Sequence, residues 1–473
     1  IQYAESNDLA GALQAFIRWD RRAASDPYYQ LAVGFALERA GDLRALVRYQ
    51  AALALDSDLM VAEQLLARLA VLELGSERSR PLVDSVARKL GDRAEARALR
   101  GLLWAVGSED TEDAPERARI SVREVDELPR PLRAVPYLLE AHQAVGLSQV
   151  RAHQSLERAL ELADSPQMAA AVGLFAIRTG DEPLAAQAAR RSSFLAPGYA
   201  RAGGIQLRAA LLGGRIDEAE RLSIQFGTSS VAALVSAAAA YERLELRRLK
   251  SALEMLGPLE NPLDDTGLAA GAEMLASGVI PSATKLELMA RPVVPWGELV
   301  ATDAALDSGN FELAEKLMGK WSETHGPAYQ LRIARLLRYR GKTEEALRKS
   351  QALVEAGFQT PPAVIEYLYA LVESGAILKA AEALEQHKER LGPSAAWFSA
   401  ILLVASGQPK VAQVKLATVP LPVEQTPLML KALAARAIAA AKDVRARPYV
   451  AAMAKRAPRH PDIAAAVALL AAR

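Results

Sequence analysis

The sequence predicts an all-α fold made of repeated helix hairpins. Three observations lead to this prediction. The chain of 473 residues is rich in alanine, leucine, arginine and glutamate and has only 5% aromatic residues, a composition that favours helix. Glycines that end apolar runs recur with a regular spacing, and a small residue follows most of them at a fixed distance. A fixed period of 20 to 50 residues is typical of a repeat architecture.

The turn glycines set the period. They follow helical apolar runs at Gly41, Gly75, Gly107, Gly146, Gly180, Gly214, Gly278, Gly309, Gly341, Gly375 and Gly407. Their spacing is close to about 33 residues, and the one long step, after Gly214, contains a degenerate turn near Leu246. A glycine ends a helix readily because it adopts the left-handed conformation that a Cβ disfavours.

An alanine stands five residues after each of the later turn glycines. These alanines are Ala185, Ala219, Ala283, Ala314, Ala346, Ala380 and Ala412. Each falls about one turn into the second helix of its hairpin, where a small side chain lets two antiparallel helices approach closely. The two patterns together predict one helix hairpin per repeat.

At this point the sequence resembles the tetratricopeptide repeat, a helix–turn–helix unit of 34 residues. The match is carried by a first-helix glycine, the turn glycine, small alanines and a closing proline at Gly173, Gly180, Ala185, Ala189 and Pro197. After a one-residue deletion a second unit fits at Gly34, Gly41, Ala45, Tyr49 and Ala52. The first-helix tryptophan of that family is mostly absent, and many units lack the closing proline.

The resemblance covers nearly the whole chain and implies about 13 to 14 degenerate repeats of bacterial type. It also implies a right-handed superhelical solenoid, because one hairpin cannot bury its apolar face until its neighbours stack on it. The first helices of the hairpins are then expected to line a concave groove.

Three stretches interrupt the period. Residues 108–115 form an acidic insertion, interpreted as a solvated surface loop, and residues 257–267 are rich in proline, glycine and aspartate. Residues 291–297 contain two prolines that stop helices, so they are the expected hinge. The predicted domains are a solenoid segment over residues 1–290 and a second over residues 291–473 with a basic end.

Charge divides at the expected hinge. The first segment carries 33 basic and 39 acidic side chains, and the second carries 24 and 17, so their net charges are about −6 and +7. The basic end comprises Lys410, Lys415, Arg436, Arg445, Arg447, Lys455, Arg456 and Arg459. Four interpretations stay open: a solvated capping face, an acidic partner, an anionic membrane surface, and head-to-tail contact with the acidic segment.

The sequence predicts neither catalysis nor a cofactor. It has no cysteine, and its five histidines, expected at the surface or in the groove, show no helical metal-pair spacing. Gly341-Lys342-Thr343 lacks the earlier glycine of a phosphate loop, and Ser282-Ala283-Thr284-Lys285 lacks an accompanying Lys-Thr-Gly. The net charge of +1 argues against nucleic acid as a partner.

The groove holds the candidate site. The resemblance implies that ligands contact first-helix residues about ten and six positions before the turn glycine. The candidates are Arg332, Arg335, Arg338, Tyr367, Tyr369, Trp397, Phe398 and Ile401. An arginine face beside an aromatic face suits a protein partner with acidic and apolar side chains. The alternative is that some of the aromatic residues are core and that the arginines are solvated.

The predicted function is a non-enzymatic scaffold or adaptor that binds protein partners. Two alternatives are a bacterial envelope adaptor, in polysaccharide export or outer-membrane complex assembly, and the regulatory part of a larger enzyme.

The most apolar stretches, residues 231–241 and 463–472, are shorter than the roughly 18 to 20 residues of a membrane span. The compartment is left open, since a targeting signal before Ile1 could have been removed. The oligomeric state is also left open.

Overall fold

The computed structural model describes most of the chain. The described residues are 11, 14, 16, 18, 23–106, 119–144, 147–213, 215–226, 230–256, 270–275, 282, 295–319, 326–423 and 426–472. Within these ranges the regular structure is helical and no strand occurs. None of the helices among the described residues combines the length and the apolar character that a bilayer crossing requires.

Two compact units divide the chain, unit 1 over residues 1–209 and unit 2 over residues 210–473. This division differs from the predicted one at residues 290 and 291, which stays a prediction. Residues 291–294 of the expected hinge, the acidic insertion at 108–115 and residues 257–267 all lie outside the described ranges.

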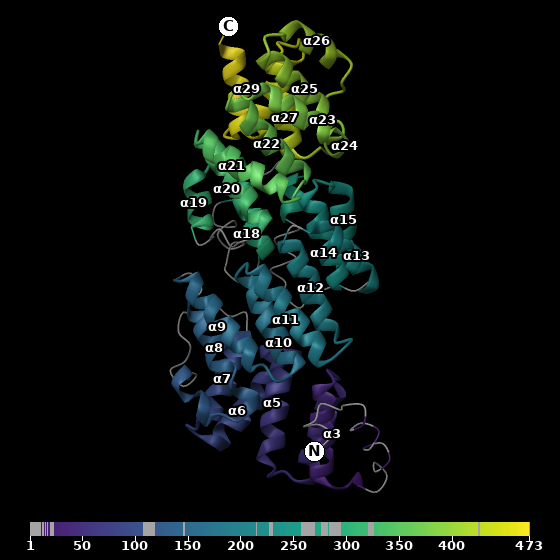
Figure 1. Ribbon diagram of the computed structural model, residues 1–473, viewed down its shortest axis with the longest axis vertical. Coiled ribbons are helices and arrows are strands. Elements are labelled where there is room, and N and C mark those ends of the chain that lie inside the picture. The colour runs from purple at the N-terminus through teal and green to yellow at the C-terminus, as the bar shows by residue number, and fades with distance from the viewer. Residues whose placement is uncertain are drawn as a thin grey trace. The chain divides into compact units, whose positions relative to one another are not determined.

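Unit 1 is a succession of antiparallel helices, drawn in purple and blue in Figure 1. Its helices are α3 (Pro27–Arg39), α4 (Arg44–Leu55), α5 (Met60–Leu74), α6 (Ser76–Leu90), α7 (Ala94–Val106), α8 (Val135–Ala144), α9 (Gln149–Leu162), α10 (Pro166–Arg178), α11 (Glu182–Leu195) and α12 (Ala200–Leu212), whose last turn belongs to unit 2. The 3₁₀ helices η2 (Val122–Glu127) and η3 (Arg130–Leu132) precede α8. Each helix packs mainly against its neighbours in the chain, as expected of stacked hairpins.

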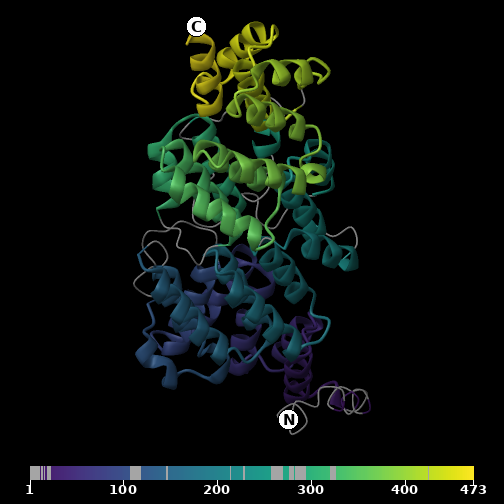
Figure 2. The ribbon, with the colours of Figure 1, turned by 45° about the horizontal axis from the view of Figure 1, so that its top comes forward.

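Unit 2 repeats the arrangement, as Figure 2 shows for its green and yellow helices. Its helices are α13 (Ile216–Ser223), η4 (Ile224–Phe226), α14 (Ser230–Glu242), α15 (Leu246–Met255), α18 (Pro295–Asp307), α19 (Phe311–Met318), α20 (Pro327–Tyr339), α21 (Thr343–Glu355), α22 (Pro361–Glu373), α23 (Ile377–Gln386), α24 (Lys388–Leu391), α25 (Ser394–Ala405), α26 (Pro409–Ala417), α27 (Leu428–Ala440), α28 (Ala446–Arg456) and α29 (Pro461–Ala471). The first helices α25, α27 and α29 also pack against one another in sequence.

The predicted turn glycines have the backbone conformation that the period requires. Seven of them have φ between +66° and +83°: Gly41, Gly75, Gly180, Gly309, Gly341, Gly375 and Gly407. Gly107, Gly146, Gly214 and Gly278 lie outside the described residues. The alanines five residues later that the structure describes are all buried. These features confirm the predicted all-α superhelical solenoid of helix hairpins.

Two turns adopt the same conformation without glycine. Leu244 has φ +59° between α14 and α15, which locates the degenerate turn expected near Leu246. Lys442 has φ +54° between α27 and α28. A residue with a Cβ pays roughly 1–2 kcal/mol in this region, so both turns are strained relative to their glycine counterparts.

Replacement of Lys442 by glycine is therefore expected to stabilise unit 2. Lys442 is exposed, so the substitution removes backbone strain with little loss of packing, and the free energy of unfolding should rise by about 1 kcal/mol in urea titrations. Lys442→Ala is the matched control, because it keeps the Cβ and should give no such gain. Equal stability of the two variants would contradict the strain at this turn.

In each unit, hydrogen bonds connect hairpins that are far apart in the sequence. In unit 1, Gln167 Nε2 donates to the carbonyl of Glu38 at 2.9 Å, 129 residues away. The hydroxyl of Tyr199 donates to Glu73 Oε1 at 2.7 Å, 126 residues away. In unit 2, Arg338 Nη1 donates to Asp462 Oδ1 at 3.1 Å over 124 residues. In both units, the start of a later first helix thus meets the end of an earlier one after about four repeats.

Candidate functional site

The three arginines predicted for the groove lie on one face of α20. Pro327 starts this helix, where its missing N–H costs nothing, and the spacing of three residues aligns Arg332, Arg335 and Arg338. All three side chains are buried, with exposed fractions of 3%, 6% and 5%. The expectation that they line an open groove is therefore corrected: they form the interior of unit 2.

Carboxylates of the same unit pair with each arginine. Arg332 Nη2 lies 2.6 Å from Asp303 Oδ2, and its Nη1 donates to Glu242 Oε2 at 3.0 Å. Arg335 binds Asp307. Glu242 is the last residue of α14 and Asp307 is the last residue of α18. Asp303 lies about one turn before Asp307 in α18.

Arg338 joins α20 to the last helix of the chain. Its Nε donates to Glu366 Oε2 of α22 at 2.6 Å, and its Nη1 to Asp462 Oδ1 of α29 at 3.1 Å. Asp462 also accepts from Arg436 Nη1 of α27 at 2.8 Å. The first turn of α29 therefore occupies the arginine face with a carboxylate, as an acidic ligand would.

Tyr369 of α22 lies between two guanidinium groups. The carbon Cζ of Arg338 is 4.4 Å from the centre of its ring, and that of Arg436 is 4.6 Å away. Such stacking is favourable because the face of an aromatic ring is electronegative. Its hydroxyl has no hydrogen-bond partner among the described residues, and burial raises the pKa of Tyr369 above its ordinary value.

The cluster holds more carboxylates than arginines. Its four arginines are Arg332, Arg335, Arg338 and Arg436, and its six carboxylates are Glu242, Asp303, Asp307, Glu366, Glu373 and Asp462. Burial alone would raise the pKa of Asp462, but Arg338 and Arg436 hold it far below its usual range. Burial raises the pKa of Glu242 although Arg332 opposes the change. Burial of Glu242 therefore favours its protonated form relative to that of an exposed glutamate.

A cavity of about 40 Å³ lies among Tyr241, Glu242, Asp303, Arg332 and Glu366. This volume accommodates water but is far below the roughly 300 Å³ of a typical small-molecule site. Apolar side chains such as Met274 and Leu331 also line it, and its charged groups already pair with one another. The arrangement supports cohesion between hairpins rather than capture of a small substrate.

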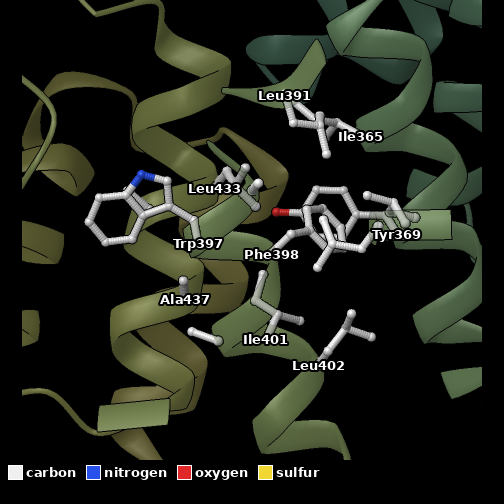
Figure 3. Packing of buried hydrophobic residues seen from close by; sticks show 14 of the residues in the cluster. Ile365, Tyr369, Leu391, Trp397, Phe398, Ile401, Leu402, Leu433 and Ala437 are labelled. Carbon is white, nitrogen blue, oxygen red and sulfur yellow. The ribbon is translucent and has the colours of Figure 1, made fainter. Parts of the chain in front are cut away.

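The aromatic candidates are core residues. Trp397, Phe398 and Ile401 of α25 are buried, and the ring of Phe398 meets that of Tyr369 edge to face with centres 4.9 Å apart (Figure 3). Tyr367 is half-buried and packs against the hydrophobic cluster that contains Tyr369 and Phe398. The structure thus agrees with the alternative that aromatic residues of this stretch pack between hairpins, and it does not show them lining a groove.

The basic end consists of two kinds of residue. Arg436 is part of the buried cluster, and Arg445 donates to the carbonyls of Leu416 at 2.7 Å and Val419 at 2.9 Å, where it covers the end of α26. Lys415 donates to Ser399. The exposed members are Lys410, Lys415, Arg447, Lys455, Arg456 and Arg459.

The sequence predicts all five histidines at the surface or in the groove, but two of them are buried. His387 ends α23, and His460 precedes α29, where its ring accepts from the N–H of Asp462; both are buried. Burial together with Arg390 lowers the pKa of His387. His325 lies outside the described residues. Among the residues that the structure describes, no three histidine or carboxylate side chains are grouped as a metal site would need.

Sequence reasoning missed the acidic half of the cluster. Arg332, Arg335 and Arg338 pair with Asp303, Asp307 and Glu366 at sequence separations of 29, 28 and 28 residues. Opposite charges that recur slightly short of one repeat are thus a sequence signal for pairing between neighbouring first helices. Asp462 and Glu242 carry no such signal, because superhelical curvature brings them to α20.

Comparison with known proteins finds solved structures that align with this chain at low sequence identity and low TM-score. No protein-family model matches the chain, and no curated protein matches it in sequence. The crystal structure of the APC/C hetero-tetramer Cut9–Hcn1 aligns with 90% of this chain and 86% of its own, at 15% identity and TM-score 0.40. Yeast Tom70 aligns over 97% and 96%, at 12% identity and TM-score 0.26. Naa15/Naa10 bound to HypK-THB aligns over 95% and 74%, at 13% identity and TM-score 0.21. At these TM-scores none of the three carries an argument about function.

Proposed function

We propose that the chain is a non-enzymatic scaffold whose hairpins bind protein partners through their outer, second helices. The observation that carries the proposal is the distribution of apolar side chains. Val47 of α4, Val150 of α9, Phe194 of α11 and Val414 of α26 expose between 63% and 74% of their area. Their recurrence on second helices, with Val47, Val150 and Phe194 in unit 1 and Val414 in unit 2, supports partner contacts on the second helices of each unit.

The charged interior supports the same proposal. The arginine face that a partner was expected to occupy is filled by Asp462 and the neighbouring carboxylates. Binding through Arg332, Arg335 and Arg338 would require α29 to leave its position. The outer helices need no such rearrangement, and the exposed Lys410 and Lys415 beside Val414 favour a partner with acidic and apolar side chains.

This function is tested by crosslinking the full chain inside cells of the organism that produces it. Mass spectrometry then identifies the crosslinked proteins and the residues that are crosslinked. Proteins crosslinked near Val47, Phe194 and Val414 are expected to be lost in a variant with Val47→Glu, Phe194→Glu and Val414→Glu. A matched control carries three glutamates at glutamine positions of the same three helices, Gln50→Glu, Gln187→Glu and Gln413→Glu, and should keep them. Crosslinks that survive in the first variant, with its helix content unchanged, would overturn the assignment of this surface.

A further inference from the structure

The hairpin turns differ in whether a loop covers them. A Cβ built on Gly41 would lie 2.9 Å from Tyr199, and one on Gly309 would lie 2.5 Å from the carbonyl of Arg459. Cβ atoms built on Gly375 and Gly407 would meet nothing within 4 Å. Cβ atoms on Gly75 and Gly341 would also meet nothing, so among these six turn glycines loops cover only Gly41 and Gly309, and in unit 2 the turns at Gly341, Gly375 and Gly407 are uncovered.

Apolar side chains are exposed beside the last of these turns. Leu378, Val411 and Val444 follow one another at intervals of one repeat and expose 82%, 51% and 86% of their area. At the same register the two preceding hairpins carry Glu312 and Glu345. The first turns of α23, α26 and α28 contain no acidic residue. The edge thus changes from carboxylates to aliphatic side chains after the hairpin that contains Gly341.

The same edge is basic. Lys379, Lys410 and Arg447 are exposed in the first turns of α23, α26 and α28, and Lys442 is exposed in the turn before α28. We call these residues, together with Leu378, Val411 and Val444, the turn edge. Its charge selects an acidic surface, and its aliphatic side chains require that surface to be partly apolar.

The covered turns show what kind of element fits such an edge. The covering element is always the connection from a second helix to the next first helix: residues 163–165 and 196–199 in unit 1, and residues 457–460 in unit 2. At the start of unit 1 the equivalent connections are residues 56–59 and 91–93. There Asp58, Asp92 and Arg93 are exposed and Asp56 is half-buried, so the two connections together carry three acidic side chains and one basic one. Leu55 and Val61 expose 46% and 54% of their area. We call Leu55, Asp58, Val61 and Asp92 the loop edge.

We infer that the chain associates head to tail with a second copy of itself, in which the turn edge of one copy receives the loop edge of the next. The two edges have opposite charge, both expose aliphatic side chains, and they are the two halves of a contact that each unit already makes internally. Such an interface joins different surfaces on the two copies, so it leaves one edge free at each end and permits open chains. The inference goes beyond the proposed function, because it names this chain as the occupant.

Sedimentation of the full chain over a range of concentrations tests the inference. We expect the average mass to rise with concentration and to fall as salt is added, because exposed opposite charges contribute. A turn-edge variant, Lys410→Glu with Arg447→Glu, and a loop-edge variant, Asp58→Lys with Asp92→Lys, should each remain monomeric. An equimolar mixture of the two variants should associate again, since each changed edge then meets a partner of opposite charge.

A matched control and two contrary outcomes complete the test. Arg247→Glu with Lys250→Glu makes the same charge change on exposed residues of α15 and should associate like the unmodified chain. An unmodified chain that stays monomeric at all concentrations overturns the inference, as does association that the edge variants leave intact. Binding of a monomeric chain to vesicles with anionic lipid through Lys410 and Arg447 would assign the turn edge to a membrane instead. The scaffold test depends on Val47, Phe194 and Val414, so the two proposals fail separately.

Discussion

Replacement of Arg338 by methionine is expected to lower the free energy of unfolding of unit 2 by about 3–5 kcal/mol. The guanidinium is buried between Glu366 and Asp462, and its removal leaves two carboxylates without their main counter-charge. The cost comes from the uncompensated buried charge and not from the lost contact area, since methionine has a similar length. Denaturant titration of the full chain, with hydrogen exchange of α20 and α29 to locate the loss, measures it.

The control for this prediction is Arg340→Met, two residues further along. Arg340 is exposed and pairs with the exposed Glu315, so this change should cost less than about 1 kcal/mol. Adding Glu366→Gln and Asp462→Asn to Arg338→Met should recover part of the loss, because neutral groups are cheaper to bury. Equal stability of Arg338→Met and Arg340→Met would show that the cluster is neither dry nor tightly paired.

Replacement of Arg68 by methionine is expected to destabilise unit 1 by a similar amount, about 3–5 kcal/mol. Arg68 and Glu38 are both 1% exposed and form an ion pair, and Tyr49 donates to Glu38 Oε2 at 2.7 Å. Without Arg68 the carboxylate of Glu38 is buried between α3 and α5 with no counter-charge from Arg68. Protection of the amides of these helices against hydrogen exchange should fall.

A double-mutant cycle separates the interaction energy of the ion pair from the contributions of the two side chains taken singly. Glu38→Gln with Arg68→Met removes both charges, so it should be more stable than Arg68→Met alone. Two nitrogens of Arg68, Nε and Nη1, have no hydrogen-bond partner among the described residues, which makes the native pair expensive to keep. A double variant no more stable than the single one would place the cost in packing around Arg68.

The local features of the fold could be predicted from the sequence. A turn at Gly341 needs only a residue that tolerates positive φ, and close helix packing at Ala346 needs only a small side chain. Both requirements are met within one hairpin, so they leave a visible period. Lys442 shows the limit of this reasoning, because a lysine can occupy the same turn when surrounding structure compensates for its strain.

The environment of the candidate site could not be predicted in the same way. The spacing of Arg332, Arg335 and Arg338 on one helical face was apparent, but their burial depends on Asp462, which lies 124 residues after Arg338. A small change in the rotation from one hairpin to the next decides whether the two meet. This rotation is the sum of many packing contacts, and no residue in the sequence encodes it alone.

The long-range closure of each unit has a consequence for how the protein unfolds. In an open solenoid each repeat contacts only its neighbours, so terminal repeats fray and the array can shorten one hairpin at a time. The contacts of Gln167 with Glu38 and of Asp462 with Arg338 connect hairpins that are separated by 129 and 124 residues. Loss of α29 would therefore disturb α20 as well as its neighbour α27. Each unit should lose structure as one cooperative block, and it should form slowly, since its ends must meet before the block is complete.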